Sequence, residues 1–219
     1  MLKKRLQAVY DMIEENSIVA DIGCDHAMLV CALVANKKCQ KAYAMDVNEK
    51  PLKQALKTIE HYNLTNNVNA ILSNGLAKIT DDVDTVVICG MGFETCKMIL
   101  ENDFDKLKRY KKIIIQINRD VYKLREWINQ NNFKITNEDI VIDHHYYQII
   151  AIDPNLNANY TNLELNYGPI LLNNKTDIFL KYLEHLKSKY FKIINKISDQ
   201  TKQKEIQNKI TEIENIISN

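Results

Sequence analysis

Glycine and proline are scarce in this chain, which has only 5 glycines and 3 prolines among 219 residues. Four of the glycines stand where predicted strands end, at Gly23, Gly75, Gly90 and Gly92. Glycine lets the backbone approach a ligand closely, and open α/β sheets bind ligands at the carboxyl ends of their strands. The placement of the glycines therefore predicts one nucleotide-type pocket at the top of a parallel sheet.

Other absences exclude whole classes of protein. The net charge is only +1, so an anionic partner must meet a local basic patch. None of the 5 cysteines forms a Cys-x-x-Cys pair, which disfavours a zinc site and indicates reduced thiols in a cytoplasmic protein. No apolar run approaches the roughly 20 residues of a membrane span, and the N-terminus lacks the apolar core of a signal peptide. We therefore expect no metal and no membrane.

Helix-like and strand-like segments alternate along residues 1–153, which we expect to form the main domain. The predicted helices cover 3–15, 26–36, 49–62, 93–104 and 121–130. The predicted strands cover 17–22, 39–47, 68–73, 83–89 and 112–117, followed by an antiparallel pair at 133–142 and 146–152. This alternation predicts an α/β fold with a Rossmann-like doubly wound sheet. An antiparallel pair that closes such a sheet is typical of class I methyltransferases.

The rest of the chain has a different pattern. Residues 154–174 are rich in asparagine and hold two of the prolines, which predicts a linker. Residues 175–219 carry apolar side chains at steps of three and four on both sides of Ser198-Asp199. That pattern predicts an antiparallel two-helix coiled-coil hairpin. A hairpin this short favours a monomer.

The segment Asp21-Ile-Gly23-Cys-Asp25-His26 follows the first strand and opens a helix. Its single glycine does not match the dinucleotide fingerprint. A carboxylate at this turn instead suits a cationic amine, such as the amino-acid end of S-adenosylmethionine. An ordinary tight turn, with Asp25 capping the helix, is an equal alternative.

Polar residues also follow the second and third strands. Asp46-Val47-Asn48 ends the second strand, where an acidic residue can accept the hydroxyls of a ribose. Asn74-Gly75 ends the third, where the asparagine can pair with an adenine amino group. The alternatives are a helix cap at Asp46 and a plain Asn-Gly turn.

The fourth and fifth strands end in residues that could face a reacting group. Gly90-Met91-Gly92 would expose backbone carbonyls there, although close helix–strand packing explains the same glycines. Gln116 and Asn118 could hold the edge of a base, or could be satisfied loop amides. The candidates for a catalytic role are Met91, Gly92 and Asn118.

The segment Asp143-His144-His145 suggests a metal at first sight. Adjacent residues on a strand point to opposite faces, so the two imidazoles would not converge on one ion. We therefore interpret it as the polar tip of a hairpin.

Basic residues gather in two places. Residues 106–125 hold eight of them against one acid, and residues 175–219 are rich in lysine. A charge run is usually a solvated face, but contact with a phosphate backbone also requires basic residues near a pocket. The candidates for RNA contact are Lys108, Arg109, Arg119, Lys123, Arg125, Lys189, Lys192 and Lys196.

Several motifs stand in one order along nearly the whole chain. They are Val19–Leu29 (VADIGCDHAML), Ser73–Leu76, Ile88–Gly92, Ile115–Asn118, Leu124–Trp127 and Tyr167–Leu171. Together they resemble the motifs of the bacterial tRNA (adenine-22-N1)-methyltransferase family. The resemblance implies methyl transfer from S-adenosylmethionine to N1 of an adenine in tRNA.

The resemblance also implies roles for individual residues. Asp21 and His26 would hold the methionine end of the cofactor, Asp46 its ribose and Asn74 its adenine. The full set expected to bind the cofactor is Asp21, Gly23, Asp25, His26, Asp46, Val47, Asn48, Asn74, Gly75 and Gly90.

The chain departs from the family pattern at several positions. Asn74 stands where the family has aspartate, Phe93 where it has glycine and Ile117 where it has proline. Cys24 and Asp46 replace serine and glutamate. Two rival functions stay open, a methyltransferase with a substrate other than tRNA and a non-catalytic RNA-binding protein. An NAD enzyme is disfavoured because the fingerprint is missing.

Overall fold

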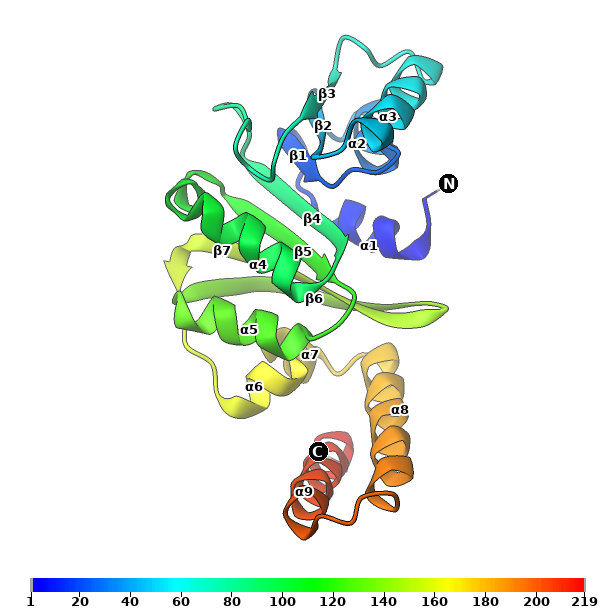
Figure 1. The fold of residues 1–219 in the computed structure, drawn as a ribbon, viewed down its shortest axis with the longest axis vertical. Helices are drawn as coiled ribbons and strands as arrows, with labels where there is room; N and C mark the ends of the chain where they lie inside the picture. Colours follow the sequence, from blue (N-terminus) through cyan, green and yellow to red (C-terminus); the bar gives the residue numbers. More distant parts are fainter. Residues whose placement is uncertain (1, 219) are drawn as a thin grey trace. The chain divides into compact units, whose positions relative to one another are not determined.

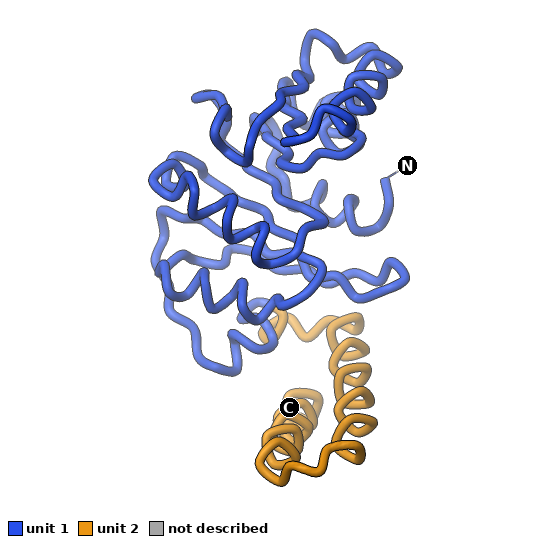
Figure 2. The backbone as a smooth tube through the Cα atoms, viewed as in Figure 1, with its two compact units in different colours: residues 1–170 blue, residues 171–219 orange. Residues whose placement is uncertain are grey.

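The structure is a computed structural model that describes residues 2–218. The chain divides into two compact units, one up to Ile170 and one from Leu171 (Figure 2). The first unit is built on a seven-stranded sheet with the strand order β3-β2-β1-β4-β5-β7-β6 (Figure 1). The strands are β1 Val19–Ile22, β2 Ala42–Asp46, β3 Val68–Leu72, β4 Thr85–Met91, β5 Lys112–Ile117, β6 Phe133–Asp143 and β7 His145–Asn157.

Strands β1 to β5 pair in parallel, whereas β7 runs antiparallel to both β5 and β6. The predicted Rossmann-like sheet with a closing antiparallel pair is therefore confirmed. The strand order reverses between the parallel neighbours β1 and β4: β2 and β3 follow on the side of β1, and β5 follows on the side of β4. Ligands of open α/β sheets bind at such a reversal, beyond the carboxyl ends of the strands.

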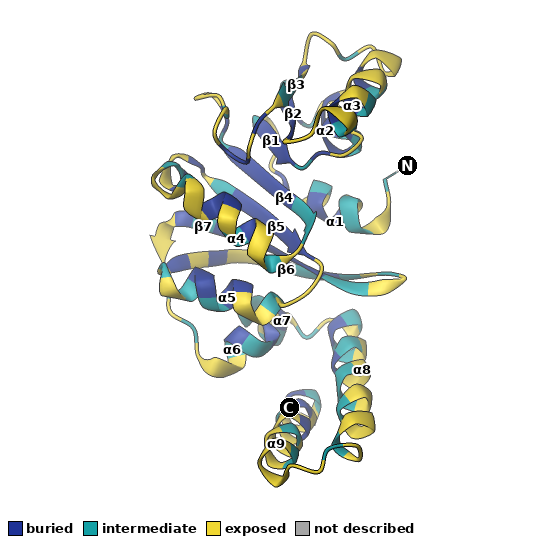
Figure 3. Cartoon of the chain, viewed as in Figure 1, coloured by how far each residue is buried: buried dark blue, intermediate teal, exposed yellow. Residues whose placement is uncertain are grey.

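Helices cover both faces of the sheet because its central strands are apolar on both sides (Figure 3). On one face α1 Lys4–Met12, α2 Met28–Ala35 and α3 Glu49–His61 share a core with Val19, Ala44 and Val87. On the other, α4 Phe93–Asn102 and α5 Val121–Gln130 share a core with Ala20, Ile88 and Ile115. A short 3₁₀ helix, η1, covers Phe104–Arg109.

The segment expected as a linker, 154–174, contains regular structure. It holds the end of β7 and two short helices, α6 Asn162–Tyr167 and α7 Pro169–Asn174. Thr161 and Glu164 form a capping box at the start of α6, which accounts for a helix in a stretch so rich in asparagine.

The second unit contains α8 Asp177–Ile194 and α9 Gln200–Ser218. Lys175 Nζ donates a hydrogen bond to the Ile216 carbonyl at 2.9 Å, and Lys209 Nζ lies 5.9 Å from the centre of the Tyr190 ring. The start of α8 thus meets the end of α9, as in an antiparallel pair. Asp199 Oδ1 accepts from the Thr201 N–H at 2.9 Å and caps α9, as the sequence predicts. No described helix has the length and apolarity needed to cross a bilayer.

Candidate active site

The end of β4 is distorted at Gly90. The pairing with β5 passes from Cys89↔Gln116 to Met91↔Ile117, so Gly90 is an extra residue in a bulge. Gly90 has a φ of +80°, and a Cβ there would lie 3.2 Å from Arg5 Nη1. Both the backbone conformation and the crowding call for glycine at this position.

Side-chain hydrogen bonds hold this bulge. Gln116 Oε1 accepts from the Gly90 N–H at 3.1 Å and from Arg5 Nη1 at 2.8 Å. Asn118 Nδ2 donates to the Gly90 carbonyl at 2.8 Å, and the Asn118 N–H donates to the Met91 carbonyl at 2.9 Å. Gln116 is completely buried. Of the two alternatives for this residue, the structure therefore favours a satisfied amide, which supports the bulge, over a contact with a base edge.

A hollow of about 460 Å³ opens between β1, β4 and the N-terminal helix. We call it the acidic hollow, after the carboxylates of Asp21 and Asp25. Its lining residues are Leu2, Lys3, Arg5, Leu6, Asp21, Gly23, Cys24, Asp25, His26, Met28, Leu29, Cys89 and Gly90. Five of the ten residues expected to bind the cofactor therefore line one cavity.

Asp21 is the most perturbed acid of this hollow. Burial, and after it the negative charge of Asp46, raise the pKa of Asp21 to about 7. Asp21 is only 5% exposed, and yet among the described residues no hydrogen bond reaches its carboxylate. A buried carboxylate without a partner is costly, and a cationic ligand would relieve that cost.

The turn after β1 is held in an unusual conformation. Asp25 and Ala27 both lie in the left-handed region, with φ values of +48° and +55°. Ala27 occupies the N-cap position of α2, so the expected cap at Asp25 is wrong. His26 Nε2 lies 3.6 Å from Asp25 Oδ1. Such strained residues cluster at functional sites, where the surrounding structure holds them in place.

The other residues expected to bind the cofactor lie at the ends of the neighbouring strands. Asp46 ends β2, and its Oδ1 accepts from the Asn48 N–H at 2.8 Å. Asn74 follows β3 and is exposed. The Gly23 N–H donates to the Met45 carbonyl and the Ser73 N–H to the Asp46 carbonyl, so the three strand ends meet at one edge. Val47, Asn48, Asn74 and Gly75 lie along this edge but do not line the acidic hollow.

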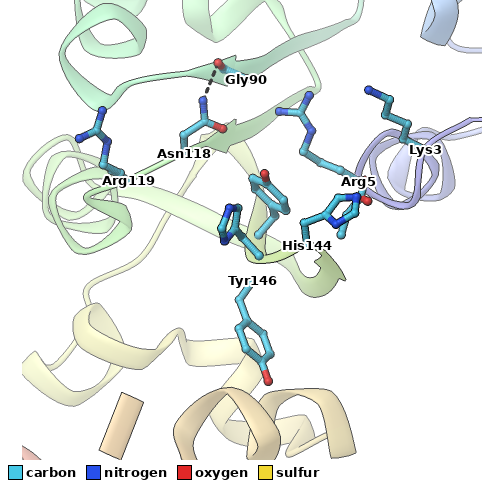
Figure 4. A pocket seen from close by; sticks show the side chains of 10 residues that line it. Lys3, Arg5, Gly90, Asn118, Arg119, His144 and Tyr146 are labelled. Atoms are coloured by element: carbon cyan, nitrogen blue, oxygen red, sulfur yellow. Dashed lines mark hydrogen bonds between the residues drawn. The ribbon is translucent and has the colours of Figure 1, made fainter. Parts of the chain in front are cut away.

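A second cavity of about 630 Å³ opens on the other side of Gly90 (Figure 4). We call it the basic pocket. It is lined by Lys3, Arg5, Gly90, Asn118, Arg119, Asp143, His144, His145, Tyr146 and Tyr147. Figure 4 shows Arg5 reaching from α1 toward the Gly90 end of β4, with Asn118 on the opposite side. Because Gly90 and Arg5 line both cavities, the acidic hollow and the basic pocket are adjacent.

The hairpin tip contributes to this pocket. His144 occupies the turn between β6 and β7 with a φ of +64°, and His145 begins β7. Because His144 is not in a strand, the alternation rule does not apply to the pair, and both histidines line the pocket. Residues 2–218 include no group of three or more histidine, cysteine or acidic side chains placed to hold a metal ion.

Of the three catalytic candidates, Met91 and Gly92 lie outside both cavities, whereas Asn118 lines the basic pocket. Met91 ends β4 and its methyl group lies against Gly23. Gly92 is the N-cap of α4, and a Cβ there would meet nothing within 4 Å. Neither residue lines the two cavities. Asn118 is the candidate that combines a pocket position with hydrogen bonds to the bulge.

The predicted RNA-contact residues of the first unit do not form one surface. Arg119 lines the basic pocket, and Lys123 is exposed on α5. Lys108 and Arg109 precede β5, at the amino edge of the parallel strands, where Arg109 pairs with Asp81. That edge is opposite to the one that carries Gly90 and Asn118, so the expected basic cluster at 106–125 is divided.

Arg125 is a correction to the sequence prediction. It is completely buried, and its Nε donates to Glu138 Oε1 at 2.8 Å while its Nη2 donates to Gln148 Oε1 at 2.6 Å. Glu138 Oε2 accepts from the Ile170 N–H at 2.9 Å. Arg125 therefore ties α5 to the closing strands and has no surface to offer to RNA.

Sequence reasoning missed the contribution of the N-terminal helix. Lys3 and Arg5 line both cavities, and Leu2 and Leu6 line the acidic hollow. One signal was available, because Arg5 is one of only four arginines in a chain with 29 basic residues. The partner of Arg5, Gln116, is 111 residues away and no local pattern joins them.

Comparisons with known proteins identify the family of the chain. The model of the tRNA (adenine(22)-N(1))-methyltransferase family matches residues 19–218. The chain belongs to this family. It is 32% identical over 215 residues to the tRNA (adenine(22)-N(1))-methyltransferase of Bacillus subtilis, covering 93% of this chain and 90% of that protein.

Solved structures with similar sequences have the same fold. TrmK of M. capricolum in complex with S-adenosyl-homocysteine has a TM-score of 0.87 and 39% identity, covering 100% of this chain and 98% of that one. A protein of the NADB-Rossmann superfamily from Streptococcus agalactiae has a TM-score of 0.92 and 33% identity, covering 99% and 97%. The cofactor of this family of enzymes is S-adenosylmethionine, as the resemblance in the sequence implies.

The residues of the acidic hollow fit that cofactor. Asp21 is a buried carboxylate without a hydrogen bond among the described residues, and it faces a cavity large enough for a small molecule. The cofactor carries an ammonium group, which is the partner that such a carboxylate lacks. The next strand ends offer Asp46 and Asn74 for its polar groups.

Proposed function

We propose that this chain transfers a methyl group from S-adenosylmethionine to N1 of the adenine at position 22 of a tRNA. The observation that carries the proposal is the position of Gly90, which lines the acidic hollow on one side and the basic pocket on the other. Family membership supplies the class of reaction. The two adjacent cavities supply a place for each reactant.

On the cofactor side, the chain contributes charge and position. Ionised Asp21 pairs with the ammonium group and His26 contacts the same methionine end. Asp46 accepts from the ribose hydroxyls, and Asn74 contacts the adenine. Val47, Asn48, Gly75 and the turn at Gly23 and Asp25 surround these groups. When bound, S-adenosylmethionine supplies the electrophilic methyl group.

On the substrate side, no general base is required, because N1 of adenine has a free lone pair. The chain must hold that nitrogen in line with the methyl group, and good alignment of this kind accounts for large rate effects. N1 lies on the pairing edge of the base, so the adenine must be unpaired and turned into the basic pocket.

The methylated base is cationic, so nearby oxygens stabilise it. The carbonyls of Gly90 and Met91 each accept one hydrogen bond from Asn118 and keep a second lone pair. Asn118 Oδ1 receives only a long contact of 3.4 Å from Gln116 Nε2. Of these three oxygens, the Gly90 carbonyl and Asn118 Oδ1 belong to residues that line the basic pocket, and we assign them to the product cation. Met91 and Gly92 line neither cavity, so we propose for them a structural role at the end of β4 and the start of α4.

The contacts to the body of the tRNA come from basic residues on both units. In the first unit, the proposed RNA-contacting residues are Arg119 in the basic pocket and Lys123 on α5. Lys189, Lys192 and Lys196 are exposed and follow one another at steps of three and four, so they share one side of α8 and its extension. We propose that the second unit is an RNA-contacting arm and that the enzyme works as a monomer in the cytoplasm, where its substrate is found.

A transfer assay with two transcripts tests the function. The protein is incubated with labelled S-adenosylmethionine and either a tRNA with adenine at position 22 or the same tRNA with guanine there. Label on the adenine transcript alone supports the proposal, and label on both rejects the target site. Binding of the cofactor without label on either transcript favours a methyltransferase with another substrate. Binding of tRNA but not of cofactor favours a non-catalytic RNA-binding protein.

A further inference from the structure

Arg5 lies at the boundary between the two cavities. It is half-buried on α1, and its Nη1 donates to Gln116 Oε1 at 2.8 Å. The centre of its guanidinium lies 5.4 Å from the centre of the Tyr147 ring, within the range of a cation–π contact. Gln116 belongs to β5 and Tyr147 to β7, and Tyr147 lines the basic pocket, so the second contact holds the guanidinium beside that pocket.

The four arginines of the chain fall into two pairs. Arg109 is neutralised by Asp81 and Arg125 by Glu138. Arg5 and Arg119 both line the basic pocket, and within residues 2–218 no carboxylate forms an ion pair with either.

The basic pocket also has a positive balance of charge. Lys3 adds a third cation, and Asp143 is the one carboxylate among the lining residues of this described cavity. Two unneutralised guanidiniums in one cavity are an unusual arrangement for a chain that pairs its other arginines. The pocket is therefore suited to an anion.

The chemistry of the reaction decides which anion. Guanidinium groups match phosphate oxygens with a planar fork of donors, and Arg5 uses only Nη1 within the described part of the chain. The methylated adenine is itself a cation, so a guanidinium gains nothing from facing the base. The negatively charged part of a nucleotide is its phosphate.

We propose that Arg5 binds a backbone phosphate of the flipped nucleotide and so sets the depth at which the base enters the pocket. The proposal rests on the proposed function, because it takes RNA as the substrate. Tyr147 and Gln116 hold the guanidinium in place. Arg5 is a residue of the substrate site, whereas Gln116 acts through it as a positioning residue.

The test compares Arg5→Ala, Arg5→Lys and Lys4→Ala. Lys4 is an exposed residue of the same helix that lines neither cavity, so its loss removes an equal charge nearby. The affinity for full-length tRNA is measured over a range of salt concentrations. The affinity for S-adenosylmethionine is measured by calorimetry without RNA.

For Arg5→Ala we expect tRNA affinity to fall on the order of tenfold. The slope of log affinity against log salt becomes shallower by about 0.7 to 0.9, the contribution of one phosphate contact. Arg5→Lys keeps the slope and loses part of the affinity, because it retains the charge but not the fork. Lys4→Ala changes neither quantity and leaves cofactor affinity within about twofold. Because Arg5 also lines the acidic hollow, cofactor affinity falls in Arg5→Ala too, but by less than tRNA affinity.

Two results would overturn the inference. One is an unchanged salt slope in Arg5→Ala, which would leave only a structural role. The other is a loss of cofactor affinity with normal tRNA binding, which would place the guanidinium on the cofactor carboxylate. If the unmodified chain methylates tRNA and either result is found, this inference alone fails. A chain that neither binds nor methylates tRNA would instead overturn the proposed function.

Discussion

The Asn118 side chain donates a hydrogen bond of 2.8 Å to the Gly90 carbonyl, and this contact joins the end of β5 to the bulge in β4. The bulge is the wall shared by the acidic hollow and the basic pocket. The amide therefore controls the geometry between the two reactants without being part of a proton transfer.

Replacing Asn118 with aspartate tests this relationship. The variant keeps the shape of the side chain but places a carboxylate oxygen against the Gly90 carbonyl. We expect kcat to fall by about 100-fold, the size of effect that small misplacements of reacting groups produce. Cofactor affinity should stay within a few-fold, because Asn118 does not line the acidic hollow. Equal losses in kcat and cofactor affinity would show that the bulge serves the cofactor as well.

Asp21 makes cofactor binding depend on pH. Its pKa in the folded protein is raised to about 7 by burial and by Asp46, and the ammonium group of the cofactor binds its ionised form. Affinity should therefore fall as the pH drops through 7, where the carboxylate takes up a proton. Asp21→Asn removes this dependence together with most of the affinity. Calorimetry from pH 6 to 8.5 measures both, and a pH-independent affinity in the unmodified protein would reject the role of Asp21.

Asp21 also makes the stability of the ligand-free protein depend on pH. This stability falls as the pH rises, whereas cofactor affinity increases. A raised folded-state pKa means that the folded protein holds the proton more tightly than the unfolded chain. The contribution of Asp21 to stability is therefore complete below about pH 4 and is lost as the pH rises to about 7. Asp21→Asn should stabilise the ligand-free protein at pH 8, by up to about 4 kcal/mol, and change little at pH 4. Chemical denaturation at the two pH values provides the comparison.

Gly168 covers the buried pair formed by Arg125 and Glu138. Its φ is +96°, and a Cβ there would lie 2.7 Å from both Arg125 Nη2 and Glu138 Oε2. We expect Gly168→Ala to lower the free energy of unfolding by about 3 kcal/mol through backbone strain and a disturbed ion pair. Gly92→Ala is the matched control, because its Cβ would meet nothing and its φ is −78°. Equal small effects in the two variants would mean that the pair adapts to the added methyl group.

The proposed RNA-contacting residues of the second unit are Lys189, Lys192 and Lys196. Changing all three to glutamate should weaken tRNA binding at least tenfold and flatten its salt dependence. Cofactor affinity should not change, because the acidic hollow lies entirely in the first unit. Lys181, Lys202 and Lys204 are also exposed in the second unit, and their triple variant controls for net charge. If both triple variants bind alike, the second unit contributes only its overall charge.

Much of the fold could be predicted from the sequence because its signals are local. Strand β5 and helix α5 lie at the predicted residues, 112–117 and 121–130. Asp199 caps α9 through a hydrogen bond from the N–H of Thr201, two residues later in the chain. Periodic patterns and helix caps involve residues that are close together in the sequence, so elements formed by such residues can be predicted from the sequence alone.

The site could be predicted only where it depends on strand ends. Asp21 and Gly90 follow from the order of strands, whereas Arg5 depends on Gln116, a contact across 111 residues. Arg125 was misjudged because a run of charge says nothing of which helix face each residue occupies. Its neighbours Leu124 and Ile128 are buried, and their spacing indicates that Arg125 shares the inward face.

A tRNA with 1-deazaadenosine at position 22 tests the central claim most directly. This base carries a C–H group in place of N1, so it keeps the shape of adenine but lacks the accepting lone pair. The account predicts that the modified tRNA binds like the adenine form, within about threefold, a small free-energy difference, and receives no label from S-adenosylmethionine. Transfer of label to the modified tRNA would contradict the account, because the methyl group would then be entering at another atom.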